Sequence, residues 1–67
     1  MVDNNLKVWR AKFDLTQEEL AEKVDVTRQT IIALEKGKYN PSVELALKIA
    51  STFKTNVVDI FHLEGEE

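Results

Sequence analysis

Apolar residues recur along the chain at the three- and four-residue spacing of amphipathic helices, in five short stretches. The first covers about residues 4–13, and the next two cover about residues 17–24 and 28–36. A fourth stretch follows Ser42, and a fifth of one or two turns follows Asn56. The positions that this pattern turns inward are Leu6, Trp9, Phe13, Leu20, Ala21, Val24, Ile31, Leu34, Leu45, Ala46, Ile49, Phe53, Val57, Ile60 and Phe61. We therefore expect one mainly all-α domain of five helices over residues 1–67.

Polar residues indicate where these helices begin and end. Thr16 and Glu19 form a T-x-x-E capping box at the start of the second helix. Thr27 and Ser42 are suitable N-caps for the third and fourth helices, and Pro41 disfavours helix at the residue before it. Gly37 is suited to end the third helix in a left-handed conformation.

The second and third helices are joined very tightly. Only Asp25 and Val26 lie between Val24 and Thr27. Two helices with so short a connection must cross at a steep angle, so the N-terminal end of the third helix projects from the domain. The small side chain of Ala21 lets the two helices approach each other closely. This is the arrangement of a helix-turn-helix, whose second helix enters the major groove of DNA.

The two ends of the chain, the head 1–5 and the tail 62–67, are candidate strands. Apolar Phe61 and Leu63 alternate with His62 and Glu64, which is a weak strand pattern. An isolated short strand is not stable. The tail could therefore pair with the head, with the same segment of a second chain, or with nothing.

The chain is acidic overall, but the distribution of its charges is compatible with binding to nucleic acid. The net charge is −3, and Glu64, Glu66 and Glu67 account for it. Residues 27–42 carry three basic side chains and one acidic one, a local charge of +2. Binding of DNA depends on the charge of the contacting face, so the sequence permits it.

The composition of the chain argues against several other classes of protein. The chain has no cysteine and one histidine, so neither a disulfide nor a metal site is expected. There is no pattern of catalytic residues, so no enzyme activity and no cofactor are expected. The apolar runs are too short for a membrane span, and MVDNNLK lacks the apolar region of a signal peptide, so we expect a cytoplasmic protein. No ligand-binding domain is apparent, so no small-molecule effector is expected.

Polar residues at the start of the third helix are candidates for reading DNA bases. Arg28 can donate two hydrogen bonds to guanine, and Gln29 can pair with adenine. Thr30 can reach a base or a phosphate, and Ile32 can contact a thymine methyl group. The alternative is a solvated helix start with Ile32 as an ordinary exposed apolar residue.

Hydrogen-bond donors flank these base-reading candidates on both sides along the chain. Such side chains are suited to phosphate oxygens at the edges of a DNA footprint. The candidate phosphate contacts are Thr16, Gln17, Thr27, Lys36, Lys38, Tyr39, Asn40 and Ser42.

The segment LTQEELAEKVDVTRQTIIALEKGKYNPS, continued by LALKIASTF and VVDIF, resembles the Cro/C1-type (Xre) helix-turn-helix family over about residues 5–61. The resemblance implies a five-helix, lambda-repressor-like domain that binds operator DNA, usually as a dimer on a palindrome. It places Gln17, Lys38 and Tyr39 on phosphate-contacting positions. It places Arg28, Gln29 and Thr30 on base-reading positions, and Arg10 with Glu35 on an ion pair between the first and third helices.

The ends of the chain also resemble a small subgroup in which the terminal strands form an antiparallel sheet that helps to make the dimer. The sequence departs from the family at Asp14, Asp25 and Lys54, where glycine is frequent. Asp tolerates a left-handed backbone better than Lys does. Ile32 replaces a residue that is usually small or polar, which affects the base preference expected there.

Two functions remain open at this point. The first is a sequence-specific DNA-binding transcriptional regulator, a repressor that binds an inverted repeat as a homodimer. The second is an antitoxin or coregulator that acts mainly through a protein partner. Salt-sensitive binding to duplex DNA favours the first, and a stoichiometric protein partner favours the second.

Overall fold

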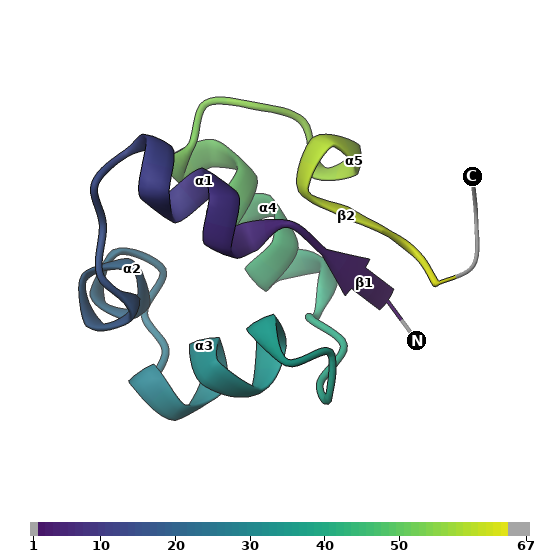
Figure 1. The fold of residues 1–67 in the computed structure, drawn as a ribbon, viewed down its shortest axis with the longest axis horizontal. Helices are drawn as coiled ribbons and strands as arrows, with labels where there is room; N and C mark the ends of the chain where they lie inside the picture. Colours follow the sequence, from purple (N-terminus) through teal and green to yellow (C-terminus); the bar gives the residue numbers. More distant parts are fainter. Residues whose placement is uncertain (1, 65–67) are drawn as a thin grey trace.

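The computed structural model describes residues 2–64 and contains five helices and a two-stranded antiparallel sheet (Figure 1). The order is β1 (Val2–Asn4), α1 (Leu6–Lys12), α2 (Gln17–Lys23), α3 (Arg28–Glu35), α4 (Val43–Thr52), α5 (Val57–Ile60) and β2 (Phe61–Leu63). The expected fold class, a mainly helical domain with a small terminal sheet, is confirmed. Residue 1 of the expected head and residues 65–67 of the expected tail lie outside the described residues.

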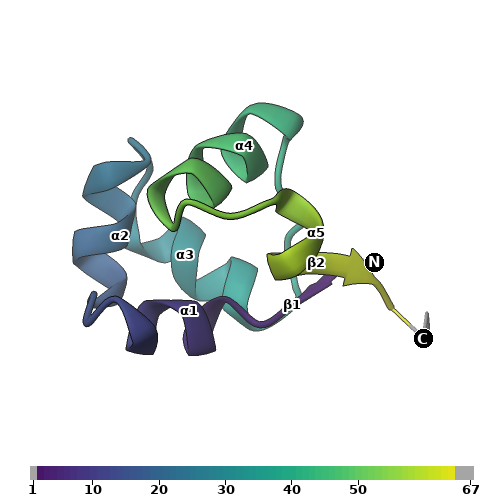
Figure 2. The same ribbon diagram turned by 90° about the horizontal axis from the view of Figure 1, so that it is seen from above.

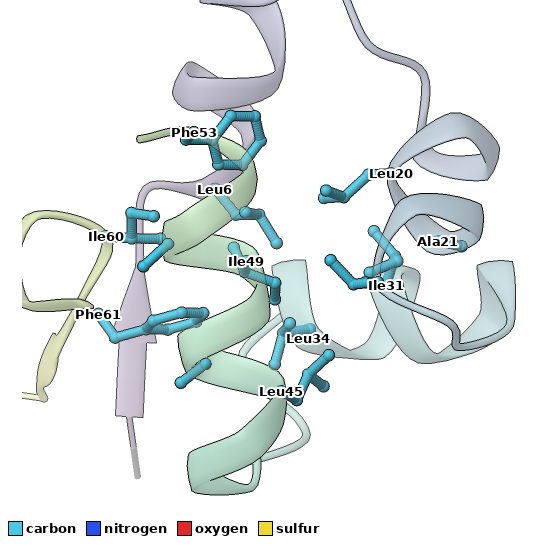
Figure 3. Packing of buried hydrophobic residues seen from close by; sticks show 13 residues of the cluster. Leu6, Leu20, Ala21, Ile31, Leu34, Leu45, Ile49, Phe53, Ile60 and Phe61 are labelled. Atoms are coloured by element: carbon cyan, nitrogen blue, oxygen red, sulfur yellow. The ribbon is translucent and has the colours of Figure 1, made fainter. Parts of the chain in front are cut away.

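The core forms where α4 packs against the other helices (Figure 3). Its buried residues are Leu6, Leu20, Ala21, Val24, Ile31, Leu34, Leu45, Ala46, Ile49, Ala50, Phe53, Ile60 and Phe61. The stripe from Leu45 to Phe53 places α4 at the centre of this cluster, as its helical spacing predicts.

The structure decides the positions of two aromatic residues, of which Phe13 differs from the expectation of an inward side chain. Phe13 is 43% exposed, because it is the C-cap of α1 and the chain turns away from the core there. Its ring still packs edge-on against Phe53, with the centroids 5.1 Å apart. Phe61, which the sequence pattern fitted both to the end of the fifth helix and to a terminal strand, is the first residue of β2 and is buried there.

Three helices begin with the hydroxyl caps expected from the sequence. Thr16, Thr27 and Ser42 each accept a hydrogen bond from the backbone N–H three residues later, at 3.0, 3.3 and 3.1 Å. The carboxylate of Glu19 completes the capping box of α2 by accepting the N–H of Thr16 at 2.8 Å. Hydrogen bonds that the Glu19 carboxylate receives from the Thr16 backbone N–H and from the Thr16 hydroxyl hold the pKa of Glu19 below its usual value.

The helices α1 to α4 all end in the same turn. The residue after each C-cap has a left-handed backbone, with φ of 56° at Asp14, 60° at Asp25, 72° at Gly37 and 56° at Lys54. Its N–H bonds the carbonyl three residues back, and the next N–H bonds the carbonyl five residues back. This pair of bonds is the Schellman motif. The three positions at which the sequence lacks a frequent family glycine are therefore left-handed in the structure.

The terminal strands pair with each other, which was one of the three arrangements left open by the sequence. Val2 lies opposite Leu63, Asp3 opposite His62 and Asn4 opposite Phe61. The sheet and α5 lie together at one end of the molecule, and α2 lies at the other end (Figure 2). Among the helices of residues 2–64, none is long and apolar enough to cross a membrane.

Candidate nucleic-acid interface

The helix α3 lies along one edge of the molecule, and no other element covers its outer side in Figure 1. Ile31 and Leu34 attach its inner face to the core. Ala21 is 2% exposed, while Val26 packs against the core beside it. Because these residues fix the inner face of α3, the opposite face remains open to a ligand.

The four candidate base readers occupy the open face and the sides of α3. Arg28 and Gln29, the first two residues of the helix, are exposed. Thr30 and Ile32 are half-buried, since each lies about 100° around the helix from the buried Ile31. The hydroxyl of Thr30 lies 3.2 Å from that of Thr27, which holds it close to the helix start.

A polar hollow of about 560 Å³ lies where α2 and α3 both begin. It is lined by Arg10, Thr16, Gln17, Glu18 and Arg28. Glu18 is a lining residue that was not among the candidates from the sequence, although its place beside Gln17 in the first turn of α2 indicates it. The hollow brings phosphate-contacting and base-reading candidates from two helices to one place.

An ion pair beneath this hollow ties three helices together. The Nε of Arg10 donates to Oε2 of Glu35 at 2.6 Å, and its Nη2 donates to Oε1 at 3.1 Å. The Glu35 side chain is only 5% exposed. Gln17 donates its Nε2 to the same Oε1 at 3.1 Å, and Arg10 also bonds the Leu15 carbonyl at 3.0 Å. The carboxylate therefore has three donors, which offset the cost of removing it from water.

The loop between α3 and α4 (residues 36–42) carries the second group of candidates. Lys36, Lys38, Tyr39, Asn40 and Ser42 are all exposed. Because Glu35 is neutralised by Arg10, the charges that residues 27–42 present to solvent are all positive. The face formed by residues 27–42 is therefore more positive than the local charge of +2 in the sequence indicates.

Several candidate phosphate contacts also have structural partners. The hydroxyl oxygens of Thr16, Thr27 and Ser42 accept cap hydrogen bonds, and the Ser42 hydroxyl keeps its proton for a phosphate. The Thr16 hydroxyl also bonds the Glu19 carboxylate, and the Thr27 hydroxyl shares a hydrogen bond with that of Thr30. Asn40 accepts the backbone N–H of Val2 at 3.0 Å through Oδ1, so its amide N–H groups can still donate. Gln17 likewise keeps one amide N–H beyond the one that Glu35 receives.

The candidates thus form two groups, one at each end of α3. An eight-residue helix is roughly 12 Å long, so donors flank the base readers on both sides over a distance similar to the width of the major groove. A tight helical pair, an open projecting helix and flanking donors define a helix-turn-helix domain.

Comparison with known proteins agrees with this class. The model of the helix-turn-helix family matches residues 6–60. An uncharacterized HTH-type transcriptional regulator of Methanocaldococcus jannaschii is 58% identical over 96% of this chain and 97% of its own. Another of Archaeoglobus fulgidus is 58% identical over 92% of this chain and 87% of its own. The chain belongs to this family and is a Cro/C1-type helix-turn-helix transcriptional regulator rather than an enzyme.

Two more distant proteins are similar to this chain, one in structure and one in sequence. A crystal structure from Bacteroides fragilis, described as that of a candidate DNA-binding protein, superposes with a TM-score of 0.81 at 26% identity. The match covers 92% of this chain and all of that one. The transcriptional repressor RstR of a cryptic phage of Vibrio cholerae is 30% identical over 90% of this chain and 54% of its own length.

Proposed function

We propose that this protein is a sequence-specific repressor that binds an inverted-repeat operator as a homodimer, with α3 in the major groove. The observation that carries the proposal is the exposure of Arg28 and Gln29 at the projecting start of α3. Arg28 reads guanine and Gln29 reads adenine, while Thr30 and Ile32 contact neighbouring bases from the sides of the helix.

Phosphate contacts on both sides fix the position of α3 in the groove. Thr16, Gln17 and Thr27 bind one strand from the polar hollow. Lys36, Lys38, Tyr39, Asn40 and Ser42 bind the other strand from the loop 36–42. Contacts of this kind position a protein on the duplex without reading its sequence.

The homodimer forms through the end of the molecule that carries α5 and the terminal sheet. An apolar hollow of about 300 Å³ there is lined by Val2, Val58, Phe61, His62 and Leu63. Val58 is 78% exposed and Leu63 is 58% exposed. A patch of this kind can meet its own copy across a two-fold axis, and its use leaves the outer face of α3 free (Figure 1).

Repression is supported by the similarity to RstR, whose name is that of a transcriptional repressor. A dimer with its two α3 helices about 34 Å apart occupies two successive major grooves and excludes other proteins from that duplex.

Selection of bound duplexes from a random pool tests the DNA-binding proposal. The expected result is an inverted repeat whose half-sites are about one helical turn apart. Recovery of unrelated sequences, together with co-purification of a stoichiometric protein partner, would instead support an antitoxin or coregulator.

The dimer surface is tested by Val58→Asp, which should convert the dimer to a monomer in sedimentation velocity. Val43→Asp is the matched control, because Val43 is 77% exposed and does not line the apolar hollow. Unchanged sedimentation of the Val58 variant would rule out this surface.

A further inference from the structure

The side chain of Asn4, in the terminal strand β1, is bonded to the end of α3. Its Nδ2 donates to the carbonyl of Leu34 at 2.8 Å, although the two residues are 30 positions apart. Its Oδ1 accepts the backbone N–H of Leu6 at 3.0 Å, which fixes the orientation of the amide. The Leu34 carbonyl also accepts the N–H of Gly37 at 3.1 Å. Asn4 therefore bonds a carbonyl group in the last turn of α3, two residues before the loop 36–42 begins.

A second hydrogen bond joins β1 to the same loop. The N–H of Val2 donates to Oδ1 of Asn40 at 3.0 Å, across 38 positions of sequence. The strand β1 is itself held by its pairing with β2. The strand β1 is thus bonded to the last turn of α3, which leads into the loop, and to Asn40 near the end of the loop.

Apart from the cap hydrogen bond of Ser42 at its end, the loop has few contacts that fix its shape. Every residue of the loop 36–42 is exposed or half-buried, so none of them anchors it in the core. Its other early hydrogen bonds, from Gly37 to Leu34 and from Lys38 to Ala33, are local and only form the helix end. The two bonds to β1 are long-range constraints on where Lys38 and its neighbours lie.

We infer that β1 positions the DNA-contacting loop, with Asn4 as the positioning residue. This inference rests on the proposed function, in which Lys38 contacts phosphate. Asn4 touches no DNA itself. It holds the loop in the geometry at which its donors meet the duplex, so that less ordering is needed on binding.

The variant Asn4→Ser tests this role. A serine hydroxyl can still accept the Leu6 N–H, but it is too short to reach the Leu34 carbonyl. Because the loop must then be ordered on binding, duplex binding should weaken about three- to tenfold on every sequence. Asn5→Ser is the matched control and should bind normally, because the Asn5 side chain makes no capping hydrogen bond.

A double-mutant cycle separates positioning from general stability. The Asn4→Ser effect should largely disappear in a Lys38→Ala background and persist in an Arg28→Ala background. Equal effects in both backgrounds would overturn the inference while leaving the proposed function standing. No loss of binding by Lys38→Ala alone would instead remove the proposed loop contact, and the inference with it.

A measurement on the wild-type protein tests the same inference even if a variant fails to fold. Because coupling is reciprocal, a duplex that fixes the loop should also strengthen the hydrogen bond between Asn40 and the Val2 N–H. Exchange of the Val2 amide proton should therefore slow when DNA binds. An exchange rate that is the same with and without DNA would overturn the inference.

Discussion

Gln17 donates its side-chain amide to the carboxylate of Glu35 at 3.1 Å, and so joins the first residue of α2 to the last residue of α3. The same carboxylate is held by Arg10 from α1. The two helices of the helix-turn-helix are therefore fixed to each other through one nearly buried anion. The contact also holds Gln17 at the edge of the polar hollow, where its second amide N–H can meet a phosphate.

Replacing Glu35 by Gln should destabilise the fold. The change leaves the Arg10 guanidinium partly buried without its charge partner and weakens three hydrogen bonds. We expect a loss of about 2 kcal/mol in the free energy of unfolding, measured by urea denaturation. Glu44→Gln is the control, since its pair with Lys48 is exposed and should be worth less than about 0.5 kcal/mol. Equal losses in the two variants would contradict the role of the buried pair.

Replacing Lys54 by Gly should stabilise the protein. Lys54 has φ of 56°, a conformation that strains an L-residue with a side chain but not glycine. After the entropy cost of glycine is subtracted, a gain of about 0.5–1 kcal/mol is expected in thermal or urea unfolding. Glycine at Lys48, inside α4, should instead lower the stability by about 1 kcal/mol. A loss of stability at both positions would show that the left-handed turn is not strained.

The capping box of α2 predicts a change of stability in acid. The pKa of Glu19 is lowered below its ordinary value of 4.5 by its hydrogen bonds with Thr16. The charged box is therefore fully stabilising well above 4.5 and is lost as the pH falls through the lower, folded-state pKa. The stability difference between the wild type and Glu19→Gln should shrink over that range in urea unfolding at a series of pH values. A difference that stays constant into strong acid would argue against the capping role.

Replacing Lys38 by Ala should weaken binding to all duplexes by a similar factor. A phosphate contact releases counterions, so the slope of log affinity against log salt should become shallower by about 1. Lys54→Ala removes the same charge and is the control, because Lys54 lies in the turn between α4 and α5, away from α3 (Figure 1). Fluorescence anisotropy over a range of salt concentrations measures both effects. A loss confined to one sequence would mean that Lys38 reads bases instead.

Local features of the fold were predictable from the sequence because they act over three or four residues. The hydroxyl caps at Thr16, Thr27 and Ser42 bond the N–H three positions ahead, and the buried stripe of α4 follows the helical period. The inner face of α3 was predictable for the same reason. The N-cap and the buried stripe together predict where α3 begins and which of its faces is exposed. The exposed start of α3 is the centre of the candidate site.

Contacts between distant parts of the chain were not predictable in the same way. Gln17 meets Glu35 and Asn4 meets Leu34 only because the helices pack as they do. Phe61 shows a related limit, since its spacing fits the end of a helix as well as a strand. Its pairing opposite Asn4 places Phe61 in the strand β2.

Base reading by Arg28 is the central requirement of the proposed function. The direct test is the affinity of Arg28→Ala for the selected operator and for a duplex of scrambled sequence, at one salt concentration. We predict a loss of about 1–3 kcal/mol on the operator, relaxed preference at one base position, and a much smaller loss on the scrambled duplex. The same loss on both duplexes would contradict base reading by the start of α3.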